Sequence, residues 1–256
     1  MVRLTNCQSS WRKFTFGKFT HILEAPSGTP SCMLYLELGC IPIRFLIMQR
    51  RLMYLHYLLQ QDGDSLLFKF TNAHIEEHIK GDWIKQININ IEEAGIIWSL
   101  EEIQKLSEEN FQLHVKKCIK KTALEWLNSE KKSKSKGVVH ADLQMQSYLR
   151  PNSLSIKQKK LLFSLRLRMI NVRENFREKY RNDKTCKLCN EETETQEHVL
   201  NCKEIVKNAN MMVDDKIEYI HIFDETVAKQ SKVAILFENL WKIRNKCMKE
   251  NDIKTS

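Results

Sequence analysis

Three cysteines and one histidine between residues 186 and 202 have the spacing of metal ligands. Cys186 and Cys189 are separated by two residues, His198 and Cys202 by three, and the two pairs by eight. Two thiolates across a tight turn can bind one cation, and His198 and Cys202 would lie on one face of a following helix. The pattern predicts a tetrahedral site with three sulfur ligands and one nitrogen ligand, a set that Zn²⁺ prefers.

The protein supplies all four of these predicted ligands. A catalytic zinc keeps one coordination position open for water or substrate. We therefore expect Zn²⁺ as a structural cofactor. The alternative is a reduced cluster of the same residues that binds no metal.

The composition predicts helices around this site. Only seven glycines and four prolines occur among the 256 residues, whereas Leu, Lys and Glu are abundant. Helical spacing begins at Ser31, with Gly39 as a stop, a capping box from Ser99 to Glu102 and a long helix from Ser107. We expect a mostly α protein, in which a helical bundle is followed by a long basic helix, a small zinc knuckle and a C-terminal helix.

Changes in composition predict the domain boundaries. Residues 130–137 contain four lysines and no apolar residue, which is typical of a solvated linker. The expected regions are a poorly defined segment over 1–30, a helical domain over 31–129, a Lys/Ser linker over 130–138, a basic helix plus zinc knuckle over 139–205, and a C-terminal helical segment over 206–256.

The sequence also bears on location. The first residues are basic and contain no apolar block of the kind found in secretory signals. The apolar stretch over 34–48 is interrupted by a glutamate, a proline and an arginine, and is too short and too polar to span a bilayer. We expect an intracellular protein, nuclear or cytoplasmic, in a reducing compartment, with no membrane partner.

Much of the positive charge lies in one segment. The formal net charge is +9, and residues 157–182 contain nine basic residues but two acidic ones. Helical spacing from about Ser155 to Asn182 places a basic arc of about 80° beside an apolar stripe. Such an arc can contact the phosphates of RNA or DNA. The predicted nucleic-acid-binding residues are Lys159, Arg166, Arg173, Arg177 and Arg181. The alternative is that these arginines pair with acids, such as Glu191, Glu192, Glu194 and Glu197, or stay solvated.

Two parts of the chain resemble the region downstream of the polymerase in non-LTR retrotransposon reverse transcriptases. The part that resembles its zinc knuckle comprises Arg173–Phe176, Tyr180, Cys186–Cys189 and Glu194–Cys202. The part that resembles its helical post-polymerase segment comprises Met33–Arg44, Arg50–Leu52, Leu55–Leu58 and Gly81–Trp83. The resemblance covers about residues 26–205. It implies a helical linker and a zinc knuckle that help to bind template RNA or target DNA, attached to a polymerase and an endonuclease.

The catalytic motifs of that family are not evident in this sequence. A polymerase needs clustered aspartates that hold two metal ions. The only Asp-Asp pair, Asp214–Asp215, follows the knuckle and has no aromatic residue before it. A restriction-like endonuclease would need a Pro-Asp and an Asp-x-Lys arrangement, and the acids from Asp214 to Glu225 do not supply one. We therefore expect a fragment without autonomous catalysis.

Three functional hypotheses follow. The first is a zinc-containing fragment of a retroelement reverse transcriptase that binds RNA or DNA, with RNA favoured. The second is a protein-interaction module or inert helical remnant with structural zinc, whose apolar faces docked on the missing polymerase domain. The third is a degenerate restriction-like endonuclease.

Overall fold

A computed structural model describes residues 25, 29–76, 82–131, 142–150, 154–175, 183–208 and 226–254. These residues are mostly helical, as the sequence predicts. They divide into two compact units. The described part of unit 1 comprises residues 39–76, 82–130 and 142–143, and that of unit 2 comprises 25, 29–38, 131, 144–150, 154–175, 183–208 and 226–254. Most of the predicted N-terminal segment and of the predicted linker lies outside the described residues.

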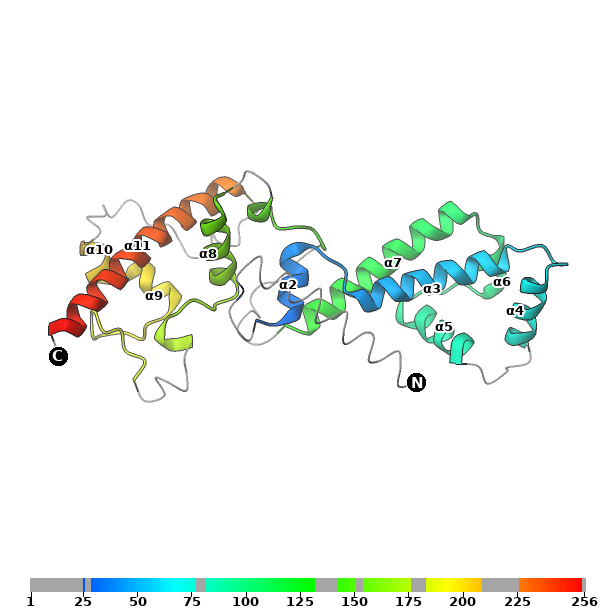
Figure 1. Ribbon diagram of the computed structural model, residues 1–256, viewed down its shortest axis with the longest axis horizontal. Coiled ribbons are helices and arrows are strands. Elements are labelled where there is room, and N and C mark those ends of the chain that lie inside the picture. The colour runs from blue at the N-terminus through cyan, green and yellow to red at the C-terminus, as the bar shows by residue number, and fades with distance from the viewer. Residues whose placement is uncertain are drawn as a thin grey trace. The chain divides into compact units, whose positions relative to one another are not determined.

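Unit 1 is a helical bundle built around two long helices. Its described helices are α3 (Ile43–Leu59), α4 (Leu66–Glu76), α5 (Asp82–Glu93), α6 (Leu100–Lys105) and α7 (Glu108–Ser129). α3 and α7 lie side by side and antiparallel (Figure 1). Phe45 packs edge-on against Trp126 and His56 stacks on Phe111, with ring centroids 5.8 and 4.6 Å apart. α7 turns one apolar stripe inward, formed by Phe111, Val115, Ile119, Ala123 and Leu127.

Several helix ends are set by the local signals that the sequence predicts. Ser99 Oγ accepts the Glu102 N–H, and the Glu102 carboxylate accepts the Ser99 N–H, so the predicted capping box is present. Ser107 caps α7 in the predicted way. Gly39 and Gly95, both with φ of 66°, follow α2 and α5 in the left-handed conformation that favours glycine.

Unit 2 contains the cysteine-rich segment and the C-terminal helix. Its described helices are α2 (Ser31–Leu38), η2 (Ser147–Leu149), α8 (Ile156–Arg166), η3 (Arg173–Asn175), α9 (Gln196–Asn201), α10 (Lys203–Asn208) and α11 (Val227–Lys254). α11 packs against α8, α9 and α10 (Figure 1). α2, which we expected in the first helical domain, groups with this unit.

A buried ion pair holds α2 against α8. Arg166 Nε lies 3.0 and 2.9 Å from the two carboxylate oxygens of Glu37, and the side chains are 3% and 0% exposed. The Tyr148 hydroxyl donates to Glu37 Oε2 at 2.8 Å, and Arg166 also donates to Gln146 Oε1 at 3.1 Å. Burial and the neighbouring Glu37 carboxylate raise the pKa of Tyr148 well above its ordinary value, so this donor stays protonated. Both buried charges therefore have partners.

α8 ends earlier than the sequence predicts. The expected helix from about Ser155 to Asn182 stops at Arg166. Arg168 adopts a φ of 53°, and the N–H groups of Arg168 and Met169 bond back to carbonyls in the last turn of the helix. This is a Schellman end with arginine at the position where glycine is usual. The prediction of one continuous basic helix is therefore wrong over residues 167–175.

The apolar run over residues 34–48 is divided between α2 and α3. Among the described residues, no single helix is both long and apolar enough to cross a bilayer. α2 and α3 meet that requirement only when they are taken together.

Replacing Arg166 with alanine should lower the free energy of unfolding by roughly 3–5 kcal/mol, because Glu37 would stay buried without its partner. Urea denaturation followed by circular dichroism measures this loss. Arg168→Ala is the matched control, since Arg168 pairs with Glu197 at 2.7 Å but the side chains are 46% and 36% exposed. We expect that change to cost less than about 1 kcal/mol. Equal losses in the two variants would contradict a special role for the buried pair.

Candidate metal centre

Cys186, Cys189, His198 and Cys202 converge within unit 2. Their ligand atoms all lie within 4.8 Å of one another. Cys186 Sγ is 4.0 Å from Cys202 Sγ, and Cys189 Sγ is 3.5 Å from His198 Nε2. Tetrahedral bonds of zinc to sulfur and nitrogen place ligand atoms about 3.6–3.8 Å apart. The cluster therefore has the size of a four-coordinate metal site and could hold a metal ion.

A short hairpin presents the first two cysteines. Thr185 and Thr193 form an antiparallel bridge at its base. The Cys186 carbonyl accepts the Asn190 N–H at 2.8 Å, which closes the turn. Asn190 has a φ of 55°, a left-handed conformation that asparagine adopts more readily than most residues. The turn thereby brings Cys189 back beside Cys186.

Helix α9 supplies His198, and the residue after the helix supplies Cys202. Thr195 caps α9, because its Oγ1 accepts the His198 N–H at 2.9 Å. Cys202 is the C-cap residue and has an extended backbone, so it does not continue the helix. The expectation that His198 and Cys202 share one helical face is therefore corrected. Val199 and Leu200 are buried, as expected for residues that pack beneath the site.

Glu192 orients the imidazole of His198. His198 Nδ1 lies 3.0 Å from Glu192 Oε2, so Nδ1–H donates to the carboxylate. Nε2 then keeps its lone pair, on the side of the ring that faces Cys189. A carboxylate behind a histidine ligand fixes the tautomer and strengthens the nitrogen as a donor. The spacing of the four cluster residues in the sequence does not identify Glu192 as a partner of His198.

The contact between the side chains of Cys186 and Cys202 shifts their pKa values in opposite directions. The neighbouring Cys202 side chain lowers the pKa of Cys186 to about 4. The same contact raises the pKa of Cys202. Since metals bind thiolates, a bound cation would release the remaining proton. The contact therefore favours the thiolate form of Cys186, which is the form that binds a metal.

Glu194 connects the hairpin to α11. Its Oε1 lies 2.7 Å from both Nε and Nη2 of Arg244, and the two side chains are 1% and 9% exposed. Its Oε2 accepts the backbone N–H of Arg173 at 3.0 Å. Gln196 is also buried. Its side chain accepts a backbone N–H just after α8 at 3.3 Å and donates to a backbone carbonyl in the last turn of α8 at 3.0 Å. The cysteine hairpin, α8 and α11 therefore form one packed structure.

The predicted nucleic-acid-binding residues lie in different environments. Arg166 is buried against Glu37, and the Arg173 guanidinium donates to Asp183 Oδ2 at 2.9 Å and to the Thr185 carbonyl at 2.8 Å. Lys159 Nζ donates to the carbonyl of the residue after η2 at 2.6 Å. The three described residues therefore do not form one exposed arc, and the alternative of pairing with acids applies to two of them. The other two predicted residues, Arg177 and Arg181, lie outside the described residues, as do Asp214, Asp215 and Asp224.

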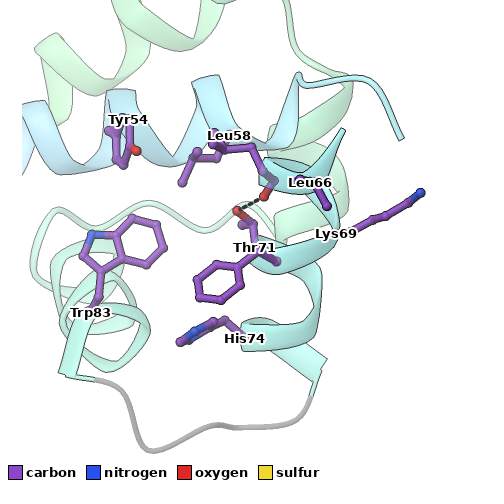
Figure 2. Close-up of a pocket in the computed structure, with 9 residues that line it drawn as sticks. Tyr54, Leu58, Leu66, Lys69, Thr71, His74 and Trp83 are labelled. Atoms are coloured by element: carbon purple, nitrogen blue, oxygen red, sulfur yellow. Dashed lines mark hydrogen bonds between the residues drawn. The ribbon is translucent and has the colours of Figure 1, made fainter. Parts of the chain in front are cut away.

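Unit 1 has a separate apolar pocket of about 750 Å³. Figure 2 shows Tyr54 and Leu58 on one side of it, Trp83 on another, and Leu66, Thr71 and His74 on α4. The Thr71 hydroxyl donates to the Leu67 carbonyl at 2.7 Å, so this polar group is already satisfied. Two of the lining residues are strongly exposed, namely Leu66 at 86% and Phe70 at 68%. The pocket suits an apolar partner better than a charged one.

Glu192→Gln should weaken metal binding by roughly 10–100-fold, because the neutral amide supports the imidazole less well than a carboxylate does. Titration with Zn²⁺ against a chromophoric chelator measures the affinity. Glu191→Gln is the matched control, since Glu191 pairs with Lys203 and not with a cluster residue. Equal affinities for the two variants would rule out the orienting role of Glu192.

No family model, curated protein or solved structure matches this chain.

Proposed function

We propose that unit 2 is a nucleic-acid-binding module whose fold is organised by one structural Zn²⁺. The observation that carries this proposal is the convergence of Cys186, Cys189, His198 and Cys202, whose ligand atoms lie within 4.8 Å of one another. Three sulfurs and one nitrogen are a donor set that zinc prefers, and four protein ligands leave no position for water or substrate. The ion then stabilises the fold, and we assign no autonomous catalysis to the chain.

The distribution of charge supports a polyanionic partner, RNA or DNA. Among the described residues, those of unit 2 include more lysines and arginines than acids, whereas those of unit 1 include more acids. A basic surface attracts phosphates and releases the counterions that surround them. The same unit therefore combines the metal cluster and the excess of positive charge.

The resemblance of residues 26–205 to non-LTR retrotransposon reverse transcriptases agrees with this function. In this proposal the chain is a piece of such an enzyme that follows the polymerase and contributes to holding template RNA or target DNA. A nuclear or cytoplasmic location fits that role.

The central test is a fluorescence-anisotropy titration with RNA and with DNA at two salt concentrations. Raising the salt from about 50 to about 200 mM should weaken binding by roughly 50-fold if four phosphates of a single strand are contacted. Removing zinc with a chelator should weaken binding further, because the hairpin then loses the ion that closes it. Tight binding whose affinity changes neither with salt concentration nor with chelator would contradict the proposal. The absence of bound zinc in protein purified under reducing conditions would also contradict it.

A second function, docking of another protein, is favoured by the pocket of unit 1. Leu66 and Phe70 expose most of their apolar surface beside it. Exposed apolar patches of this kind mark interaction surfaces or cause self-association. In this alternative, zinc holds a helical scaffold and the pocket receives an apolar side chain of the polymerase domain.

The double substitution of Leu66 and Phe70 by asparagine should reduce self-association of the isolated chain, as measured by analytical ultracentrifugation. Stability should change little, because both side chains are exposed. Ile97→Asn is the control, since Ile97 is 92% exposed and does not line the pocket. If the control reduces self-association equally, the pocket has no special role.

A further inference from the structure

We infer that the exposed face of α11 is the surface that contacts single-stranded RNA. This inference rests on the proposed function and assigns the contact to residues outside the predicted basic helix. Among the residues of α11 whose side chains are described, five lysines are exposed, and four of them fall within an arc of about 100° when each residue turns the helix by about 100°. We call them the α11 lysine ridge: Lys232, Lys242, Lys246 and Lys249.

The packing of unit 2 fixes which way this ridge points. The buried residues of α11 include Val233, Phe237, Leu240 and Arg244. On the same helical projection, the centre of this buried face lies about 180° from the centre of the ridge. Since α11 packs against α8, α9 and α10, the ridge is left on the side that faces solvent.

The ridge keeps a net positive charge despite two neighbouring acids. Glu238 Oε1 lies 3.0 Å from Lys242 and 2.8 Å from Lys157 of α8, so two lysines share one carboxylate. Lys246 is 4.0 Å from Glu250, and the two side chains are 78% and 54% exposed. An ion pair that exposed contributes little and is readily exchanged for a phosphate. Lys157 also extends the basic surface from α11 onto α8.

The spacing of the ridge favours a flexible strand over a duplex. At 1.5 Å per residue, successive lysines are separated by about 15, 6 and 4.5 Å along the helix axis. A single strand can move its phosphates to such unequal intervals, whereas a duplex holds them in a fixed array. Lysine binds phosphate as a point charge and does not read base edges in a bidentate way. The ridge therefore suits binding with little sequence preference.

The same face is poorly suited to a membrane. An interfacial helix needs an exposed apolar face that enters the lipid. In α11 that face is already buried within unit 2. Among the residues of α11 whose side chains are described, the large apolar residue exposed on the ridge is Ile235, at 49%. Among polyanions, RNA presents unpaired loops and strands to proteins more often than DNA does. Single-stranded RNA is therefore the partner that we assign.

The test replaces all four ridge lysines with glutamine in the full chain and measures binding of a fluorescein-labelled oligouridylate against salt concentration. The slope of log affinity against log salt should fall by about 0.7 for each lysine that contacts a phosphate. The matched control replaces four exposed lysines of unit 1, namely Lys85, Lys116, Lys117 and Lys121, and changes the net charge by the same amount. This control should leave the slope unchanged. Circular dichroism and zinc content, which should not change, show that each variant folds.

Each outcome separates the ridge from the proposed function. If the unmodified chain binds RNA but the ridge variant keeps its slope, the ridge assignment fails and nucleic-acid binding stands. A control variant that loses as much as the ridge variant also overturns the assignment, because the effect then reflects net charge alone. Tighter binding of duplex RNA, or of the DNA strand of equal length, overturns the choice of single-stranded RNA. If the unmodified chain binds neither RNA nor DNA, the proposed function itself fails.

Discussion

The buried carboxylate of Glu194 is the contact on which the arrangement of unit 2 depends. It directly follows the metal-site hairpin, accepts the N–H of Arg173 before the hairpin, and pairs with Arg244 on α11. A charge removed from water must have its partners in place, so these three segments are held in one geometry. The segment that contains the cysteine cluster and the helix that carries the α11 lysine ridge are therefore joined through Glu194.

Short-range patterns allowed much of the metal centre and several helix ends to be predicted from the sequence. Ligand spacing and capping boxes act within a few residues, so the cysteine cluster and the cap at Ser99 could both be recognised. Partners that are distant in sequence could not be recognised in this way. Glu37 meets Arg166 across 129 residues, and Glu194 meets Arg244 across 50. A charged residue inside an apolar run, as at Glu37, signals a buried partner but does not identify it.

The basic segment shows why charge in a sequence does not define a surface. Helical periodicity continued past Arg166, and no glycine marked the end of α8, because Arg168 itself takes the left-handed conformation. Arg166 and Arg173 then became tertiary partners of carboxylates. The planar guanidinium group suits such buried contacts, whereas lysine keeps its compact, strongly hydrated charge in water. For this reason the exposed lysines of α11 are better placed than those arginines to meet a polyanion.

The separation in sequence between the contacts of unit 2 also implies an order of assembly. The hairpin and α9 bring all four cluster residues together from a segment of the chain that runs only from Cys186 to Cys202. The Glu194–Arg244 contact must close a much longer loop. Loops between near neighbours close faster and at a lower entropic cost. The hairpin and α9 should therefore come together early, and α11 should dock on them afterwards. A chain emerging from the ribosome could thus bind a metal ion at the cysteine cluster before α11 has docked.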